Sequence, residues 1–353
     1  MAYLEFKNVR VAGMSAGVPK RVSSNLHPAE DLSFAEGTAP EDFVKLTGVE
    51  ERHVSDTLCT SDLCYEAAEK LIDELNWDKK EIECLLFVSQ TADYILPCTA
   101  CILQDRLGLS KECFASDCTL GCSGWVYGMA QVLSLLSAGT IKKALLLCGD
   151  AKGRVESPKD PLFGCAGTVT ALEYSEGAKG FQFHFGTDGS GYDAIITPDG
   201  GSRNKVSAAS FVPEEFEGKM MHRLQTRMKG MDVFAFGIST PPKSVKRLAE
   251  HYGFDYHDAD YFVFHQANMK MVNMIAKKLK LEPEKVPSCM LHYGNTSSAS
   301  IPLTIVTQLR EKVQANPTKF ICCGFGVGLS WGTVAFETEN IVIPEVVLVD
   351  ELL

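Results

Sequence analysis

Apolar runs of strand length recur along this chain, and the stretches between them carry apolar residues at helical spacing. Runs of this kind occupy residues 85–88, 144–148, 261–264 and 320–323. Uninterrupted apolar runs of four to eight residues predict strands that are buried on both faces, as in parallel sheets covered by helices. The alternation of the two patterns predicts an α/β fold of βαβ units with a mainly parallel sheet.

The order of these elements repeats once. Each copy has an apolar strand, at 85–92 and at 261–268, that leads into a helix ending near residues 109 and 281. Three landmark pairs have nearly equal separations: Gln90 and Gln266 by 176 residues, Cys122 and Asn295 by 173, and Gly149 and Gly324 by 175. Such regularity indicates duplication of one unit. We expect an N-terminal half over 1–175 and a C-terminal half over 176–353, packed around a shared pair of buried helices.

Cys122 stands immediately before a long apolar helix. The stripe that predicts this helix consists of Val126, Met129, Ala130, Leu133 and Leu136. The helix dipole places roughly half a positive charge at the first turn, which favours thiolate over thiol. Gly121 and Gly124 permit a sharp strand-to-helix turn. Cys122 is therefore a candidate nucleophile, whereas the alternative for a chain with 13 cysteines is a small buried apolar residue.

Other polar residues follow predicted strands at the sheet edge where ligands of α/β proteins bind. His265 ends one strand, Asn295 stands in a Gly-Asn-Thr-Ser turn, and a glycine-rich run at 324–328 follows another strand. Singly, each has a structural explanation: a hydrogen-bonded histidine, a turn or capping asparagine, and a tight loop. Their joint appearance at repeat-related positions favours a catalytic group made of Cys122, His265 and Asn295.

Composition restricts the class of protein. A formal net charge of −11 argues against nucleic acid as a partner, because neutralising phosphates requires clustered Lys and Arg. The first seven residues alternate like a strand rather than a signal peptide, and no apolar run approaches the roughly 18 residues that a membrane helix needs. We expect a soluble cytoplasmic protein without membrane insertion. Cys98 and Cys101 form one C-x-x-C without a second pair, so reduced thiols are expected rather than a disulfide framework or a metal site.

Four motifs, in order, resemble β-ketoacyl-acyl carrier protein synthase III of the thiolase-fold condensing enzymes. The motifs lie at 117–125, 265–268, 294–300 and 324–332, with shorter matches at 47–53 and 186–190. The resemblance implies a five-layered αβαβα fold and a homodimer. In the family, a residue from the segment that matches 94–97 closes the partner's acyl pocket, which makes Leu96 the candidate here.

The resemblance also implies roles for the candidate residues. Cys122 takes up an acyl group from a thioester while backbone N–H groups of Cys122 and Gly326 hold the oxyanion. His265 and Asn295 then donate hydrogen bonds to a malonyl thioester as carbon dioxide leaves, and the enolate attacks the acyl-cysteine. The substrates are acyl and malonyl thioesters on acyl carrier protein or coenzyme A, in fatty-acid initiation or a specialised acyl or polyketide pathway. No metal or organic cofactor is implied.

Three positions depart from the family pattern for coenzyme A. Asp42 stands where a tryptophan stacks on adenine, Leu46 replaces a basic residue, and the second stacking position falls in a shortened stretch around 158–160 without an arginine. Because an aspartate neither stacks on adenine nor attracts phosphates, we expect the primer to arrive on a carrier protein or as an unusual thioester. The segment 163–167 also departs from the acidic family pattern, which either reshapes the active-site floor or repacks a buried turn.

Acyl carrier proteins are acidic, so docking requires a local basic surface. By the resemblance, Lys270, Lys277 and Lys278 on the helix after His265 supply it, and a second group adjoins them: Arg223, Arg227 and Lys229. The alternative is a solvated helix face.

Two other functions fit the same motifs. One is an acyltransferase of this fold that moves the acyl group from Cys122 to an alcohol or amine, with His265 as general base and Asn295 dispensable. The other is a noncatalytic partner subunit, which the intact Cys122, His265 and Asn295 disfavour.

Overall fold

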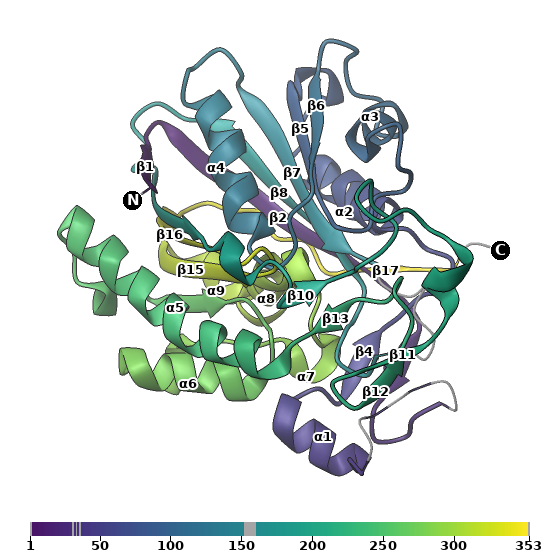
Figure 1. Cartoon of the computed structure of the whole chain (residues 1–353). Coiled ribbons are helices and arrows are strands. Elements are labelled where there is room, and N and C mark those ends of the chain that lie inside the picture. The colour runs from purple at the N-terminus through teal and green to yellow at the C-terminus, as the bar shows by residue number, and fades with distance from the viewer. Residues whose placement is uncertain (1, 30–31, 33, 35–36, 152–159, 352–353) are drawn as a thin grey trace.

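Two mixed sheets organise the computed structural model, which describes residues 2–29, 32, 34, 37–151 and 160–351 (Figure 1). The six-stranded sheet has the order β17 (Val347–Val349), β2 (Val9–Pro19), β8 (Ala166–Tyr174), β7 (Lys143–Asp150), β5 (Cys84–Val88), β6 (Phe114–Cys118). The five-stranded sheet has the order β1 (Ala2–Phe6), β9 (Phe181–Thr187), β16 (Ser330–Thr338), β15 (Thr318–Gly326), β14 (Tyr261–Phe264).

The α/β class is confirmed. The expectation of a mainly parallel sheet holds for the six-stranded sheet, in which only β8 runs against the other strands, and is wrong for the five-stranded sheet, in which only β14 and β15 pair in parallel. The strands β5, β6 and β7 are mutually parallel, as are β14 and β15, whereas β8 runs antiparallel to both β7 and β2. In the other sheet β16 runs antiparallel to both β15 and β9. Both faces of each sheet are covered, so every central strand is apolar whatever its direction, and the apolar pattern does not report direction.

Three helix layers enclose the sheets. The central layer contains α4 (Gly124–Leu136) and α8 (Ser300–Gln308); one outer layer contains α2 (Thr60–Glu74) and α3 (Thr99–Arg106), and the other α5 (Gly230–Tyr252) and α6 (Met269–Leu279). Three separate clusters of buried apolar residues correspond to the interfaces: one joins both sheets to the central helices, and the other two each join one sheet to its outer helices. The predicted five-layered αβαβα architecture is confirmed.

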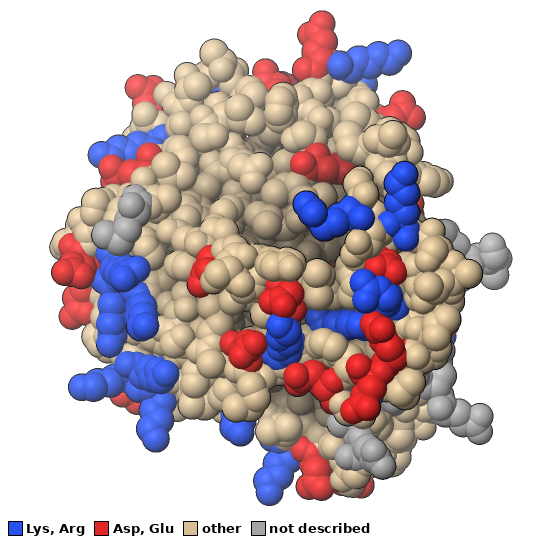
Figure 2. Space-filling view, viewed as in Figure 1, with Lys and Arg blue, Asp and Glu red and all other residues tan. Residues whose placement is uncertain are grey.

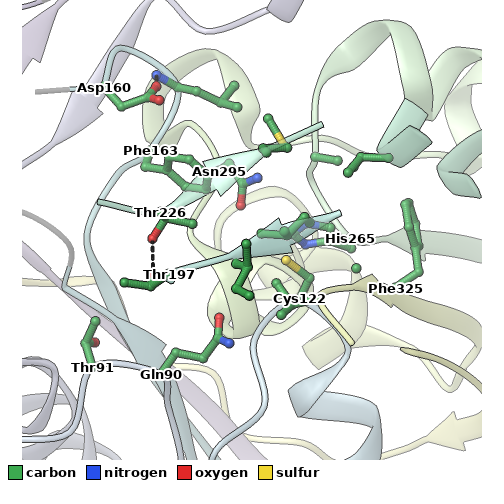
Figure 3. A pocket seen from close by; sticks show the side chains of 18 of the residues that line it. Gln90, Thr91, Cys122, Asp160, Phe163, Thr197, Thr226, His265, Asn295 and Phe325 are labelled. Carbon is green, nitrogen blue, oxygen red and sulfur yellow. Dashed lines mark hydrogen bonds between the residues drawn. The ribbon is translucent and has the colours of Figure 1, made fainter. Parts of the chain in front are cut away.

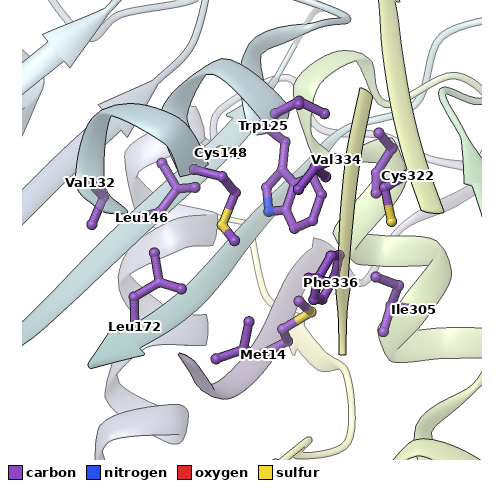
Figure 4. Packing of buried hydrophobic residues seen from close by; sticks show 14 of the residues in the cluster. Met14, Trp125, Val132, Leu146, Cys148, Leu172, Ile305, Cys322, Val334 and Phe336 are labelled. Carbon is purple, nitrogen blue, oxygen red and sulfur yellow. The ribbon is translucent and has the colours of Figure 1, made fainter. Parts of the chain in front are cut away.

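The central cluster explains why α4 is apolar over most of its surface. Trp125 of α4 is 1% exposed and lies between the two sheets with Met14 and Phe336 (Figure 4). Its indole Nε1 donates a hydrogen bond to Thr170 Oγ1 over 3.0 Å, which satisfies the one polar atom of the side chain. Within α4 only Gln131 and Ser134 are exposed, so the faces of this helix that meet the two sheets are buried and its start at the candidate site is held firmly.

Each terminal strand belongs to the sheet built mainly from the opposite half of the chain. β1, at the start of the chain, pairs with β9 in the five-stranded sheet, and β17, near the end, pairs with β2 in the six-stranded sheet. The chain passes from one sheet to the other between β8 and β9. The division at residue 175 stays a prediction, and the exchanged strands tie the two proposed halves together.

Smaller elements surround this framework. Short helices are α1 (Pro40–Thr47), α7 (Met290–Tyr293) and α9 (Arg310–Ala315). Short strand pairs are β3 (Val22–Ser24) with β4 (Glu51–His53), β10 (Ile195–Ile196) with β13 (Arg227–Met228), and β11 (Glu214–Phe216) with β12 (Lys219–Met221).

Candidate active site

Cys122 is held in the turn between β6 and α4. The amide of Gly124 donates to the carbonyl of Gly121 over 2.7 Å, which closes this turn, and the hydroxyls of Ser123 and Ser330 lie 2.7 Å apart and tie the start of α4 to β16. The partly exposed side chain of Cys122 lines a cavity of about 830 Å³ (Figure 3). That volume lies within the usual range for small-molecule sites.

Glycines pack directly against this cysteine. A Cβ atom at Gly326 would lie 2.6 Å from Cys122 Cβ and 2.9 Å from its Sγ, and one at Gly324 would lie 2.9 Å from the Cys122 carbonyl oxygen. Only residues without a side chain permit this approach. The glycine-rich run at the end of β15 thus brings its backbone next to the sulfur, where the family resemblance predicts an oxyanion hole with Gly326.

His265 follows the last residue of β14 and is 2% exposed. Its amide donates to the carbonyl of Cys323 over 2.9 Å, which extends the pairing of β14 with β15 and fixes the backbone. Its Nδ1 lies 2.8 Å from Ser300 Oγ, and its ring meets Phe325 edge-on with 5.6 Å between centroids. Because Ser300 engages Nδ1, Nε2 is the ring nitrogen that faces a ligand in the cavity.

Asn295 is held by a turn between α7 and α8. Gly294 before it has φ 64°, and its backbone lies so close to the carbonyl of Leu162 that a Cβ would stand 2.6 Å from that oxygen. The Asn295 amide donates to the same carbonyl over 2.9 Å, and its side-chain Oδ1 accepts from the amide of Ser297 over 2.9 Å. The oxygen of the carboxamide is thereby occupied, which leaves Nδ2 as the donor toward the cavity.

The three candidate side chains come together. Cys122, His265 and Asn295 line the same cavity and point toward its interior from three separate segments (Figure 3). The sequence left two possibilities for the segment at 163–167, and the structure shows elements of both. Phe163 lines the cavity and its backbone pairs with Asn295, whereas Cys165 is buried against Leu58 and Leu63. The amide of Gly164 donates to the Asn295 carbonyl over 3.1 Å, so this segment supports the asparagine.

Several buried cysteines have thiols that are expected to stay protonated and unreactive. Burial raises the pKa of the Cys289 and Cys323 thiols to about 12 and raises the pKa of the Cys148 and Cys322 thiols well above the ordinary value. A thiol that stays protonated is a poor nucleophile. These cysteines match the small-apolar-residue explanation, and Cys122, on the cavity, does not.

Several cavity residues were not found from the sequence. They are Cys59, Gln90, Thr91, Asp160, Thr197, Thr226 and Phe325. The sequence repeat could have indicated Gln90 as a cavity residue, because it corresponds to Gln266, which follows β14 next to His265. The two threonines had none, since they flank two-residue strands that no sequence pattern marks.

Leu96 lies apart from the cavity of its own chain. It is 84% exposed, and its neighbours Tyr94 and Ile95 are 64% and 96% exposed. An exposed apolar tip of this kind is typical of an interaction surface. Its role toward a second subunit stays a prediction.

The basic surface on α6 is larger than the sequence indicated, because residues of α5 extend it. Lys270, Lys277 and Lys278 are exposed on α6, and Lys270 lies over the ring of Phe234, a cavity residue. The exposed Lys243, Lys246 and Arg247 of α5 join them; these six residues are called the α5–α6 patch below (Figure 2).

The second basic group does not contribute free charge, which corrects the expectation from sequence. Arg227 is 6% exposed and bonded to Glu214, while Arg223 pairs with Asp199 and Glu214. Lys229 is paired with Asp193 over 2.6 Å. Each cation is matched by a nearby carboxylate, so this group is close to neutral.

Asp42 and Leu46 are exposed on α1, which packs against α6: a Cβ at Gly48, the α1 cap, would lie 2.3 Å from Met269 Cγ. The two departures from the coenzyme A pattern therefore face solvent near the start of α6. Of the stretch around 158–160, only Asp160 belongs to the described residues, and it lines the cavity.

Within the described part of the chain, no group of three or more His, Cys, Asp or Glu side chains is arranged to hold a metal ion. Cys98 and Cys101 place their sulfurs 3.2 Å apart as free thiols. None of the described helices combines the length and apolarity of a bilayer span.

Comparison with known proteins identifies the family. Residues 116–189 match the model for 3-oxoacyl-(acyl-carrier-protein) synthase III, and residues 249–338 match the model for its C-terminal part. The chain is 31% identical to a putative 3-oxoacyl-(acyl-carrier-protein) synthase 3 of Campylobacter jejuni, with 96% of this chain and 98% of that protein covered. It is 30% identical to a β-ketoacyl-(acyl-carrier-protein) synthase III of Desulfitobacterium hafniense, with 94% and 98% covered.

Solved structures agree. A 3-oxoacyl-(acyl-carrier protein) synthase from Burkholderia xenovorans superposes with a TM-score of 0.91 at 37% identity, covering 99% of each chain. The similarity in sequence and in fold extends over nearly the full length of this chain. The family motifs surround the cavity that is lined by Cys122, His265 and Asn295. The chain belongs to the 3-oxoacyl-(acyl-carrier-protein) synthase III family of condensing enzymes.

Proposed function

We propose that this transferase catalyses acyl transfer to Cys122 followed by decarboxylative condensation with a malonyl thioester, in fatty-acid initiation or a specialised acyl or polyketide pathway. The observation that carries the proposal is the convergence of the Cys122 sulfur, the His265 imidazole and the Asn295 carboxamide on a single cavity, with Gly326 packed against the sulfur. Family membership supports condensation as the reaction class.

The first step is a thioester exchange. The Cys122 thiolate attacks the carbonyl carbon of the acyl thioester, and the oxyanion accepts hydrogen bonds from the backbone amides of Cys122 and Gly326. The intermediate collapses, the bond from carbon to the carrier sulfur breaks, and the carrier leaves as a thiolate that takes up a proton from solvent. Each preorganised donor of this kind contributes on the order of 3 kcal/mol in the transition state.

The second step forms the carbon–carbon bond. The malonyl thioester carbonyl accepts hydrogen bonds from His265 Nε2 and Asn295 Nδ2, so the electron pair released with carbon dioxide is held as an enolate. The enolate carbon attacks the acyl carbon on Cys122, and the Cys122 thiolate leaves. We infer that no metal or organic cofactor takes part, because both side-chain donors act on the enolate oxygen directly.

The contact with Ser300 favours the tautomer of His265 that this step needs, with the proton on Nε2. When the Ser300 hydroxyl donates to Nδ1 over the observed 2.8 Å, the ring proton of the neutral imidazole resides on Nε2. Asn295 is oriented in the same sense, since its Oδ1 already accepts from Ser297. Both contacts turn donors rather than acceptors toward the substrate carbonyl.

We further propose that acyl carrier protein delivers both thioesters. The α5–α6 patch offers positive charge to an acidic partner, and it adjoins the cavity through Lys270 over Phe234 and through Asn268, which caps α6 and lines the cavity. Asp42 and Leu46 on the adjoining α1 remove the stacking and cationic contacts that coenzyme A would need. The exposed loop with Ile95 and Leu96 fits a homodimer in which each subunit contributes Leu96 to its partner.

The deciding experiment measures carbon dioxide release and condensation product with malonyl-carrier protein for the wild-type enzyme and Asn295→Ala. Condensation requires that decarboxylation and product formation both fall by at least about 100-fold in Asn295→Ala, while intact-protein mass still shows an acyl group on Cys122. Cys59→Ser, which removes another cavity thiol, is the matched control and retains acylation.

The alternative functions give different results. An acyltransferase would keep full transfer to an alcohol or amine in Asn295→Ala. A noncatalytic subunit would show no acyl mass on Cys122 in the wild-type protein.

A further inference from the structure

We propose that the acyl group accepted by Cys122 carries an uncharged hydrogen-bonding group, such as a hydroxyl, along its chain. The inference rests on the proposed function, because it concerns the group that Cys122 accepts. It follows from the two unlike walls of the cavity.

The wall next to α6 is apolar. It is formed by Val233, Phe234 and Phe236 of α5 and by Met271 of α6. This wall adjoins the α5–α6 patch through Phe234, so the carrier arm enters along it. The acyl chain bound to the sulfur then extends toward the opposite wall.

The opposite wall carries polar groups among the apolar side chains of Ile195, Ile196, Leu224 and Met228. Thr197 and Thr226 lie across the cavity from Phe325, and Gln90 lies below them (Figure 3). The pairing of Ile196 with Arg227 brings the two threonines together, and their hydroxyl oxygens lie 3.1 Å apart. Two hydroxyls carry two protons and their mutual bond uses one. Within the described residues neither hydroxyl has another partner, so one proton and several lone pairs are available to a ligand.

Gln90 adds a donor and an acceptor beside the reacting sulfur. A Cβ at Gly121 would lie 2.3 Å from Gln90 Oε1, so the carboxamide rests on the residue that precedes Cys122. In the described part of the structure this carboxamide makes no hydrogen bond. Thr91, its neighbour, is different, because its hydroxyl is engaged by Thr60 and Asp150.

An alkyl chain against this wall would take water away from polar groups without replacing its hydrogen bonds. Sites built to bond a polar substrate group discriminate strongly against analogues that lack it. A carboxylated chain is disfavoured for another reason: the carboxylates of Asp93 and Asp160 line the cavity and repel a second negative charge. An uncharged polar chain satisfies both conditions.

The test compares acylation of Cys122 by three pantetheine thioesters, whose arm is common to coenzyme A and carrier proteins: butanoyl, 3-hydroxybutanoyl and succinyl. Rates are followed by intact-protein mass. We expect 3-hydroxybutanoyl to exceed butanoyl by about tenfold, from one or two hydrogen bonds gained, and succinyl to be slowest. The variant Thr197→Val/Thr226→Val keeps the shape and removes both hydroxyls, so its preference should fall below about threefold.

Two further variants serve as a second test and as a control. Gln90→Met removes the carboxamide alone and should also lower the preference, which provides a second measurement if the double variant folds poorly. Thr240→Val, on α5 and outside the cavity lining, is the matched control and should keep the wild-type ratio.

A wild-type preference for butanoyl or succinyl, or a 3-hydroxybutanoyl preference that survives the double variant and Gln90→Met, would overturn the inference while leaving the condensation chemistry intact. Failure of all three thioesters to acylate Cys122, in a folded protein, would instead refute the proposed function and the inference with it.

Discussion

Replacement of Gly326 by alanine tests whether backbone approach to the cysteine is essential for catalysis. The new Cβ would lie 2.6 Å from Cys122 Cβ and 2.9 Å from Sγ, whereas ordinary contacts begin near 3.4 Å. Either the sulfur or the glycine-rich run must move by several tenths of an ångström to about 1 Å. Cys122 is fixed by the start of a buried helix, so the backbone amide of residue 326 is displaced from the oxyanion position.

The size of the effect follows from that displacement. Loss of one oxyanion donor lowers turnover by roughly 100- to 1,000-fold, and a misplacement of about 1 Å costs on the order of 100-fold. We therefore expect Gly326→Ala to slow acylation of Cys122 by at least about 100-fold. Overpacking of this kind lowers the free energy of unfolding by about 1–3 kcal/mol.

The assay is the initial rate of acyl-mass gain at Cys122, with circular dichroism and thermal unfolding recorded on the same samples. Gly189→Ala is the matched control, because a Cβ there meets no atom within 4 Å. Acylation in folded Gly326→Ala within about threefold of wild type would refute the reasoning, since the backbone approach would then be incidental.

Three other predictions address different parts of the molecule. Ser300→Ala removes the hydrogen bond to His265 Nδ1 and should slow malonyl decarboxylation by about tenfold while the rate of Cys122 acylation is unchanged; equal slowing of both would mean a general structural defect. His184 is buried and its pKa is lowered to about 4, so the unfolded chain binds a proton that the folded chain does not between pH 6.5 and 4. Stability should fall by up to about 2 kcal/mol from pH 7 to pH 5 in urea titrations, and His184→Gln should lose most of this dependence. Lys277→Glu/Lys278→Glu should raise KM for carrier-protein substrates by about tenfold and leave kinetics with pantetheine thioesters unchanged; an unaltered KM would move the docking surface elsewhere.

The sequence alone was sufficient for the element types and for the candidate catalytic side chains. Strand and helix are encoded locally, by apolar periodicity and by glycines at turns, so the helix after Cys122 and the strand before His265 could be predicted. The repeat of nearly constant length then related Cys122 to Asn295. The family motifs implied the five layers, and the structure confirms them.

Strand direction and the exchange of terminal strands required the tertiary structure. An apolar strand covered on both faces has the same composition whether its neighbour is parallel or antiparallel, so β8 and β16 could not be oriented from sequence. β1 and β17 pair with strands far away along the chain, and such pairings depend on nonlocal contacts.

The chemistry of the cavity walls was decided in the same way. Nothing in the sequence around Arg227 distinguishes it from an exposed docking residue, yet folding buries it against Glu214. Nothing marks Thr197 and Thr226 as partners, because they meet only when two short strands cross the cavity. A local pattern fixes what each segment can become, whereas the partner of a side chain depends on segments that the chain brings together only on folding.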